Sequence, residues 1–236
     1  MSTIPPPARR AFRNLHTLPP IRAVTFDVGG TLIEPYPSVG HVYAKVAARH
    51  GLSLLPDVLN RRFAAAWRAR KNFAHARSGW SELVDATFAG LTEIPPSRTF
   101  FAELYDEFTF PRAWRIYDDV VPALQFLRGR GLKLGIISNW DERLRPLLRI
   151  LELDVWFDAI GISVEIGQSK PNPAVFQRVA AALGVEPPSI LHIGDSRVED
   201  LEAARAAGFR ALLIRRAEPS VPDDSMAALT DVETHV

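Results

Sequence analysis

The chain of 236 residues contains no cysteine, which excludes disulfide bonds, zinc–thiolate centres and a thiol nucleophile. It also lacks any apolar run of the roughly 18–20 residues that a membrane-spanning helix needs. Neither sign of charge dominates, because 28 lysines and arginines face 27 acids and leave a formal net charge of +1. We therefore expect no nucleic acid and no membrane as a partner. The 47% of hydrophobic residues are enough to form a sizeable core.

The first 20 residues, MSTIPPPARRAFRNLHTLPP, lack the apolar stretch of a secretory signal. Their prolines and polar residues predict a flexible N-terminal tail over residues 1–20. Arginines without acids leave an organelle-targeting peptide as the alternative. We expect a cytoplasmic protein that is a monomer or a homodimer.

Short strand-like runs alternate with helical patterns beyond this tail. Runs rich in β-branched residues, each ending in polar residues or glycine, cover residues 21–27, 132–139, 158–163, 189–196 and 210–214. Helical patterns cover residues 141–151, 173–183 and 197–207, and the last two end at Gly184 and Gly208. This alternation predicts the α/β fold class, with a doubly wound parallel sheet whose ligands bind at the carboxyl ends of the strands.

Residues 36–115 interrupt the alternation with several apolar stripes of helical period. Pro56 is expected in the first turn of one helix and Ser97 at the N-cap of another. We predict a helical cap domain over 36–115, inserted into a core formed by residues 21–35 and 116–236.

Polar residues lie at or just beyond the ends of the predicted strands, where the fold would bring them together. Asp27 ends the first strand, Lys170 lies in the loop GQSKPNP, and Asp195 begins the sequence DSRVED, which contains Asp200. The residues that end the second strand are Ser138 and Asn139. Each alone is typical of a cap or a turn, but together they predict one concave polar site.

The chemistry that needs such a set is phosphoryl transfer. A carboxylate can attack phosphorus and form a covalent intermediate, and the anionic group is stabilised by positioned charges. Mg²⁺ prefers a few oxygen ligands, which Asp27, Asp195 and a backbone carbonyl could supply. Lys170 would neutralise the phosphoryl oxygens and keep Asp27 ionised. The residues expected to bind the phosphate through hydrogen bonds are Ser138, Asn139, Thr31 and the amides of Gly29 and Gly30.

The strings DVGGT, IISN, KPNP and GDSRVED, in this order, resemble the four motifs of the haloacid dehalogenase-like hydrolase superfamily. The resemblance covers residues 21–214 and implies a Rossmann-like core, a helical type 1 cap and a Mg²⁺-dependent phosphatase acting on a small phosphorylated metabolite. The strings DVGGTL, ISNWDERL and LHIGDS are most similar to the branch called haloacid dehalogenase-like hydrolase domain-containing protein 3.

The resemblance also implies a role for each motif residue. Asp27 corresponds to the nucleophile that carries the aspartyl-phosphate, and Ser138 to the phosphate-binding residue of the second motif. Lys170 matches the lysine of the third motif. Asp195 matches the metal ligand of the fourth motif, and Asp200 matches its supporting acid.

Gly29 departs from the Asp-x-Asp pattern of the family's phosphatases, in which the second aspartate is the general acid and base. The resemblance implies that this position still contributes its backbone carbonyl to the metal. Its side chain cannot donate a proton, however, and general acid–base catalysis typically accelerates a reaction by about 10²–10⁴-fold. One interpretation is a phosphatase whose acid is weakened or relocated to Glu34 or Asp141. A second is a phospho-ligand-binding or regulatory module with low turnover.

A third interpretation is a 2-haloacid dehalogenase or a phosphonate hydrolase, since relatives with these activities also lack that aspartate. The intact GDS string argues against a 2-haloacid dehalogenase. Phosphonate cleavage needs a cap lysine, for which only Lys45 and Lys71 are available. Outside the motifs, we expect His192 to be a core histidine and Trp140 to serve packing or to line the site.

Overall fold

The computed structural model describes residues 18–70, 73, 75–216, 222 and 224–236. Most of the predicted tail and Lys71 lie outside these residues. Within the described residues, none of the helices combines the length and the apolar character that crossing a membrane requires.

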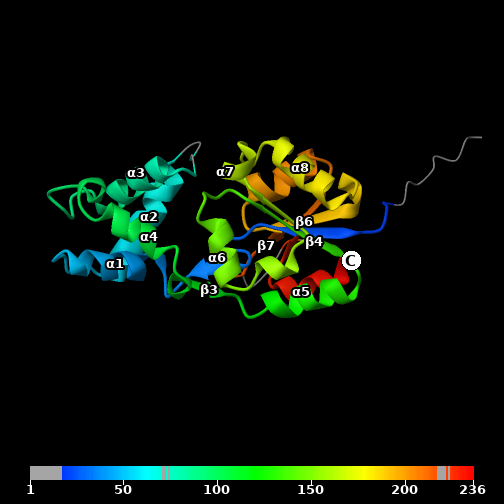
Figure 1. Ribbon diagram of the computed structural model, residues 1–236, viewed down its shortest axis with the longest axis horizontal. Coiled ribbons are helices and arrows are strands. Elements are labelled where there is room, and N and C mark those ends of the chain that lie inside the picture. The colour runs from blue at the N-terminus through cyan, green and yellow to red at the C-terminus, as the bar shows by residue number, and fades with distance from the viewer. Residues whose placement is uncertain (1–17, 71–72, 74, 217–221, 223) are drawn as a thin grey trace, which may run out of the picture.

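A parallel sheet of six strands forms the centre of the described structure, in the order β5-β4-β1-β6-β7-β8 (Figure 1). The strands are β1 (Ala23–Phe26), β4 (Lys133–Ser138), β5 (Ala159–Ile162), β6 (Ile190–Gly194), β7 (Arg210–Ile214) and β8 (Ser225–Met226). β1 lies between β4 and β6 and pairs with both in parallel. The α/β fold class with a doubly wound sheet is therefore confirmed.

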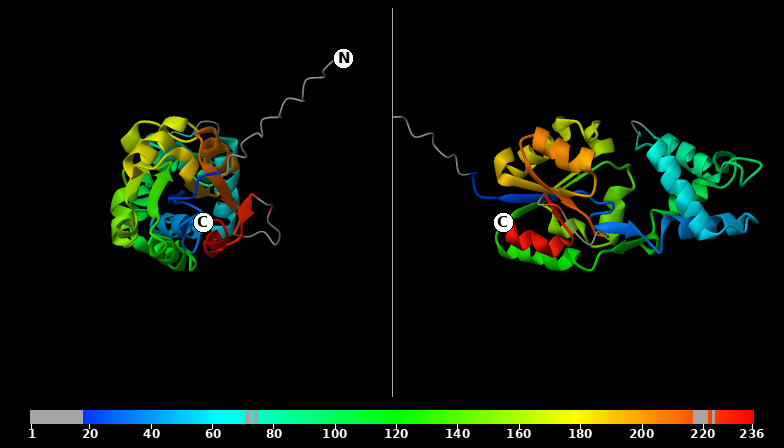
Figure 2. Two further views of the ribbon diagram at one scale, coloured as in Figure 1. Left: turned by 90° about the vertical axis from the view of Figure 1, so that its right-hand side faces the viewer. Right: turned by 180° about the vertical axis from the view of Figure 1, so that it is seen from behind.

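Helices cover both faces of the sheet, because alternate residues of each strand point to opposite sides. Val24 and Phe26 pack in one apolar cluster with α5 (Val120–Gly129) and α6 (Leu144–Ile150), while Ala23 belongs to the other. The second cluster contains residues of α8 (Pro173–Leu183) and α9 (Ala203–Ala206). Figure 2 shows these two layers from other sides. The remaining short elements of the core are α7 (Ser163–Ile166), the six-residue π-helical turn Arg197–Glu202 and the 3₁₀ turns Asp154–Trp156, Pro187–Ser189 and Leu229–Thr234.

The segment between β1 and α5 forms a separate helical layer beside the carboxyl ends of the strands (Figure 1). An antiparallel ribbon of β2 (Ile33–Pro35) and β3 (Trp114–Ile116) leads into it and out of it. Its helices are α1 (Val39–Arg49), α2 (Pro56–Ala69), α3 (Arg77–Phe88) and α4 (Phe101–Glu107), with 3₁₀ turns at Pro96–Arg98 and Pro111–Ala113. These helices pack around an apolar cluster of their own. We refer to residues 36–113 as the helical insertion.

The helix boundaries agree with most of the sequence signals. Pro56 lies at the start of α2, and Gly184 and Gly208 adopt positive φ angles of 61° and 88° after their helices. The prediction for Ser97 was wrong. Ser97 lies within the 3₁₀ turn, and α4 begins later with Phe100 at its N-cap. The backbone N–H of Ser97 donates to Asp85 on α3 instead, so a tertiary contact replaces the expected cap.

Candidate active site

The carboxyl ends of β1, β4 and β6 meet beneath the helical insertion and bring the predicted polar residues together. Asp27 follows β1, Ser138 ends β4, Asp195 follows β6, and Lys170 enters from the loop before α8. They lie at one end of a cavity of about 380 Å³ whose walls come from both the core and the insertion. The sheet topology thus supplies the convergence that the motif order predicted.

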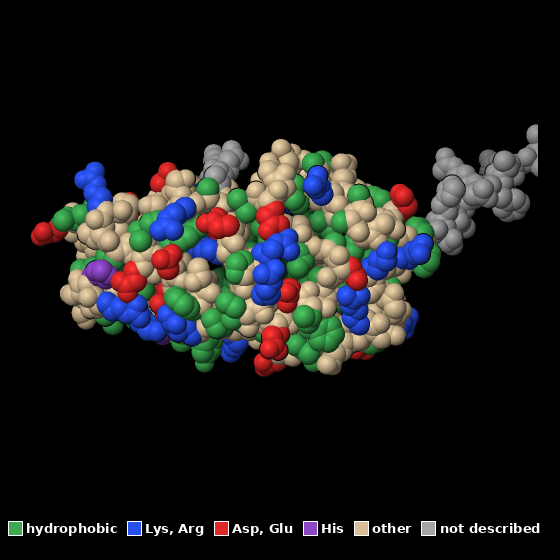
Figure 3. All heavy atoms as spheres, in the orientation of Figure 1, with side chains coloured by type: hydrophobic (Ala, Val, Ile, Leu, Met, Phe, Trp, Pro, Cys, Tyr) green, Lys and Arg blue, Asp and Glu red, His purple; other side chains and the backbone are tan. Residues whose placement is uncertain are grey.

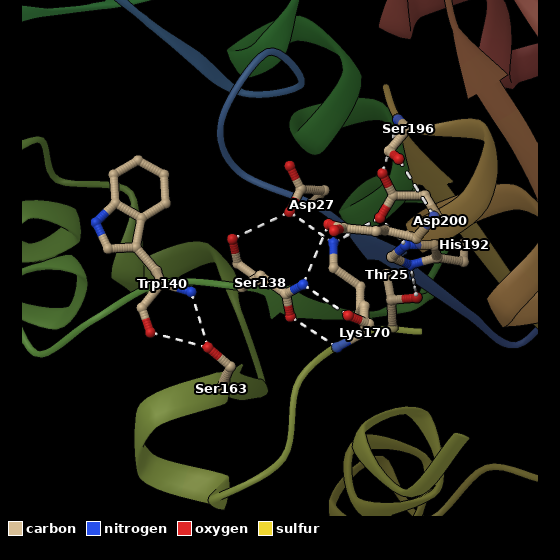
Figure 4. A network of polar contacts seen from close by, with 11 residues as sticks. Thr25, Asp27, Ser138, Trp140, Ser163, Lys170, His192, Ser196 and Asp200 are labelled. Carbon is tan, nitrogen blue, oxygen red and sulfur yellow. Dashed lines mark hydrogen bonds and ion pairs between the residues drawn. The ribbon is translucent and has the colours of Figure 1, made fainter. Parts of the chain in front are cut away.

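The carboxylate of Asp27 is held on one side by two donors (Figure 4). Its Oδ1 accepts a hydrogen bond from Ser138 Oγ at 3.0 Å and one from Lys170 Nζ at 2.8 Å. Burial raises the pKa of Asp27 above its ordinary value, while the charge of Lys170 opposes that shift and favours the carboxylate. Both of these side-chain donors use Oδ1, which leaves Oδ2 available to a reacting group.

Lys170 is buried between two carboxylates. Its Nζ donates to Asp200 Oδ1 at 2.5 Å as well as to Asp27. Desolvation alone would lower the pKa of Lys170, but Asp200 and Asp27 outweigh it and raise that pKa above its usual range. Asp200 loses hydration in the same place, which would raise its pKa, yet Lys170 and His192 hold that pKa well below normal. The lysine is therefore a fixed cation.

His192 on β6 extends this network into the core. The ring is fully buried, with Nε2 at 3.2 Å from Asp200 Oδ1 and Nδ1 at 3.0 Å from Thr25 Oγ1. Burial lowers the pKa of His192, which favours the neutral ring. A neutral ring that receives a hydrogen bond from Thr25 can donate from Nε2 to Asp200. The expected core histidine is thus a partner of the acidic cluster, a contact that the sequence did not suggest.

The loop that carries Lys170 is fixed by Asn139. The side chain of Asn139 accepts from the Lys170 backbone N–H at 2.7 Å and donates to the Lys170 carbonyl at 2.9 Å. It also donates to Glu199 Oε2 at 3.1 Å. Asn139 lines the cavity, but its bonds position the lysine loop.

Three carboxylates form a set that fits a cation. One oxygen each from Asp27, Asp195 and Asp200 lies within 4.8 Å of the others. Water reaches Asp195, but partial desolvation raises its pKa to about 7, and repulsion from Asp27 and Asp200 adds to the rise. A divalent cation would relieve this repulsion, and hard oxygen donors are the ligands that Mg²⁺ prefers. Asp200 already accepts hydrogen bonds from Lys170 Nζ and from the Ser196 N–H. It therefore helps to position the other two acids.

The backbone loop after β1 lies close against this acidic set. A β-carbon on Gly30, whose φ is +75°, would stand 2.4 Å from Asp195 Oδ2. Only glycine allows both this left-handed conformation and this close approach. Gly30 therefore has a clear structural role beside the predicted metal site.

Comparisons with known proteins agree with this geometry. A family model described as haloacid dehalogenase-like hydrolase matches residues 21–208. The chain belongs to this family. Human haloacid dehalogenase-like hydrolase domain-containing protein 3 is 33% identical over 205 residues, which span 82% of this chain and 82% of that protein. The resemblance inferred from the motifs is therefore confirmed.

Two further relatives are phosphatases by name. Glyceraldehyde 3-phosphate phosphatase of Methanopyrus kandleri is 36% identical over 119 residues, covering 46% of this chain and 49% of that protein. The crystal structure of the HAD phosphatase from Thermococcus onnurineus matches with a TM-score of 0.66 and 25% identity, covering 91% of this chain and 97% of that chain. The chain is thus similar to hydrolases over nearly its whole length.

By the motif resemblance, Gly29 stands where the family's phosphatases carry their second aspartate. A β-carbon on Gly29 would stand 3.3 Å from Cζ3 of Trp140, which follows β4. A side chain at position 29 would therefore press against the indole unless the ring shifted. Trp140 also lines the cavity, so it serves the site as well as packing. Figure 4 shows it beside the network of Asp27 and Ser138.

The structure does not bring every predicted phosphate ligand to the cavity. Thr31 is fully buried, its Oγ1 has no partner among the described residues, and it lies outside the cavity lining. The Gly30 N–H donates to the Ile33 carbonyl at 2.9 Å and so closes the turn. Of the predicted phosphate ligands, Gly29, Ser138, Asn139 and Lys170 line the cavity.

Neither candidate for a relocated acid lines the cavity. Glu34 faces Arg115 across the β2–β3 ribbon and forms an ion pair with it. Asp141 is fully buried and accepts from Arg143 Nη2 at 2.6 Å and from Tyr105 Oη at 3.0 Å. Both carboxylates are therefore committed to structural contacts.

The cap lysine expected for phosphonate cleavage also finds no support in the described residues. Lys45 forms an ion pair with Glu107 at 3.5 Å, and it does not line the cavity. The cavity residues that sequence reasoning missed are mostly aromatic and come from the insertion. No motif marks them, because their common position depends on how the helices pack.

Proposed function

We propose that this hydrolase is a Mg²⁺-dependent phosphatase that acts on a small phosphorylated metabolite through an aspartyl-phosphate on Asp27. The observation that carries the proposal is the position of the Asp27 carboxylate. It lies at the inner end of a cavity, fixed through one oxygen by Lys170 and Ser138, beside two further acids. A cavity of about 380 Å³ is of a size that suits a small molecule.

In the first step, Asp27 Oδ2 attacks phosphorus and the bond from phosphorus to the leaving oxygen breaks. Lys170 and Ser138 hold the attacking carboxylate and lie where they can donate to the phosphoryl oxygens. In the second step, water attacks phosphorus, and the Asp27 carboxylate leaves with its electron pair. Asp27, Asp195 and the Gly29 carbonyl would hold Mg²⁺, with Asp200 behind them, and the ion would neutralise phosphoryl charge.

The helical insertion would act as the cap in this proposal. Its residues form the wall of the cavity opposite the acids, so it would exclude water and select the leaving group. Gly29 has no side chain that could protonate the leaving oxygen, and neither Glu34 nor Asp141 lines the cavity, so the rate should depend strongly on the leaving group. Acyl and aryl phosphates should be hydrolysed faster than alkyl phosphates, because their leaving oxygens need no proton.

The test is a panel of phosphorylated metabolites that is assayed with Mg²⁺ and with EDTA. We expect hydrolysis that requires Mg²⁺ and falls by about 10³-fold or more in Asp27→Asn, because the amide cannot act as a nucleophile. Asp57→Asn, at an exposed position on α2, is the matched control and should keep its activity. Hydrolysis that Asp27→Asn retains would disprove the proposal.

The covering of Gly29 by Trp140 also favours a second candidate, a phospho-ligand-binding module with low turnover. Such a module would bind phosphate or a phospho-ligand through Lys170 and would hydrolyse no member of the panel. Calorimetry with inorganic phosphate on the native protein and on Lys170→Met separates the two functions. Metal-dependent turnover that Asp27→Asn abolishes would rule the binding module out.

A further inference from the structure

Aromatic rings dominate the wall of the cavity that faces the acids. They come from the helical insertion, from the ribbon and from the loop after β4, and they include Phe63, Trp67, Trp80, Trp114 and Trp140. The acids, Lys170 and Ser138 line the part of the cavity that the core forms, and Trp140 lies beside them over Gly29. The cavity therefore has an anion-binding part and an aromatic part.

The rings present flat faces rather than a random apolar lining. Phe63, Trp67 and Trp80 follow one another in a row, with centroid separations of 6.1 Å and 5.9 Å and interplanar angles of 18° and 22°. Trp114 and Trp140 form a second contact, with centroids 5.3 Å apart. Trp67 is 41% exposed, so part of its ring is accessible although it lines the cavity. Such faces gain most from a planar ring, whereas a sugar or short alkyl group gains little.

The aromatic part of the lining also carries polar groups, namely those of Tyr43, His75, Tyr105 and Arg143 and the indole N–H of Trp80. Trp80 Nε1 is shielded from water and has no partner among the residues that the structure describes. An unpaired N–H in such a place is unfavourable, so an acceptor on a ligand that reaches it after a small movement of the ring would be favourable. Burial in this apolar wall also lowers the pKa of His75 to about 4, so its ring is neutral at pH 7.

The position of Trp140 over Gly29 gives an independent constraint on the leaving group. No carboxylic acid stands at that position to protonate the departing oxygen. A phenolic oxygen, with a pKa near that of tyrosine at about 10, can leave without a proton, whereas an alkoxide leaves poorly. The missing acid and the aromatic wall therefore select the same kind of leaving group.

We propose that the substrate is a phosphate monoester of a hydroxylated aromatic ring, with the ring among Trp67, Trp80 and Trp140 and the phosphate at Asp27. This inference rests on the proposed phosphatase function. Asp27 forms a bond to phosphorus, the bond from phosphorus to the aryl oxygen breaks, and its electron pair leaves with the phenolate. Water later displaces Asp27 as the carboxylate, and the products are inorganic phosphate and the phenol, which takes its proton from water.

The test compares phenyl phosphate with acetyl phosphate, which also needs no acid but has no ring. In the native protein, we expect kcat/KM to be higher for phenyl phosphate. Trp80→Leu should lower kcat/KM for phenyl phosphate by about tenfold and change it less than twofold for acetyl phosphate. Trp80→Phe keeps a ring and should keep most of the preference. Trp156→Phe, which replaces a tryptophan outside the cavity lining, is the control.

The outcomes separate this inference from the function on which it rests. Hydrolysis of acetyl phosphate that depends on Mg²⁺ and Asp27, with no preference for phenyl phosphate and no selective effect of Trp80→Leu, overturns the substrate class alone. If neither compound is hydrolysed, the phosphatase function is disproved. Calorimetry with phenylphosphonate and methylphosphonate then tests whether the cavity recognises an aromatic ring. Tighter binding of phenylphosphonate that Trp80→Leu removes supports ring recognition, and equal binding overturns it.

Discussion

The indole of Trp140 lies so close over Gly29 that a β-carbon on the glycine would stand 3.3 Å from Cζ3 of the ring. The two residues come from different loops, one after β1 and the other after β4, at the carboxyl edge of the sheet. The indole is also in contact with the ring of Trp114 on β3. The absence of a side chain at position 29 and the close approach of the indole are thus two parts of one arrangement.

Because of this arrangement, Gly29→Asp alone should not restore acid catalysis, since Trp140 blocks the new carboxyl group. Gly29→Asp combined with Trp140→Ala should raise kcat/KM for an alkyl phosphate by about 10²-fold over Trp140→Ala alone. The gain should be much smaller for phenyl phosphate. Steady-state kinetics with both substrates measures the difference.

Gly29→Asn combined with Trp140→Ala is the matched control, because asparagine has the same shape but cannot donate a proton as an acid. An equal gain with asparagine would show that added space, rather than a proton, is responsible. If Gly29→Asp alone gave the full gain in kcat/KM for the alkyl phosphate, Trp140 would have to move aside freely and would not block the position.

Lys170→Met should destabilise the fold as well as abolish activity. The substitution leaves Asp27 and Asp200 buried without their shared cation, which typically costs about 3–5 kcal/mol. Without Lys170, the pKa of each acid rises above its value in the unfolded chain. The loss of stability is therefore largest at neutral pH and shrinks as the pH falls and the acids bind protons.

Denaturant unfolding of native protein and Lys170→Met at pH 5 and pH 8 measures this effect in metal-free buffer. Lys133→Met is the control, because Lys133 is exposed and its ammonium donates to the neutral Leu183 carbonyl, with no ion pair among the described residues. An equal loss of stability in both variants at both pH values would contradict the role of Lys170 as the shared cation.

The sequence predicted the part of the site that depends on strand ends. Parallel strands place their carboxyl ends at one edge, so Asp27, Ser138 and Asp195 had to meet there once the strands were recognised. The contact of His192 with Asp200 was not predictable in the same way. It depends on the π-helical turn over Arg197–Glu202, which brings Asp200 back towards β6.

The sequence also predicted that residues 36–115 contain helices, but not which of their side chains line the cavity. Trp67 and Trp80 lie on different helices, and only the packing of α2 against α3 makes their rings neighbours. The sequence also failed to predict the role of Ser97. It was expected at a helix N-cap, but its backbone N–H donates to Asp85 on another helix. Local patterns define elements, while the apolar wall results from tertiary packing.

Mg²⁺ should bind more tightly as the pH rises from 6 to 8. In the metal-free protein the pKa of Asp195 is about 7, so below that pH a proton competes with the cation for this carboxylate. Affinity should fall by up to about tenfold per pH unit below 7 and level off above it. Calorimetric titration in buffers of different ionisation enthalpy measures both the affinity and the proton that is released. Affinity that does not change with pH would contradict this role of Asp195, and Asp195→Asn should weaken the pH dependence.

His192 should affect catalysis through Asp200 and Lys170, although it does not line the cavity. Its Nε2 contacts the Asp200 oxygen that also accepts from Lys170, so His192→Phe leaves that carboxylate with one partner fewer and frees the lysine to shift. Mutation of residues that orient metal ligands typically lowers metal affinity or activity by about 10–100-fold, and we expect a loss of this size in kcat and Mg²⁺ affinity, with KM nearly unchanged.

His192→Gln, which retains an amide donor, should recover part of the loss. His235→Phe replaces an exposed histidine far from the site and is the control. A purely structural role would instead lower the melting temperature and leave kcat per folded molecule unchanged in both His192 variants.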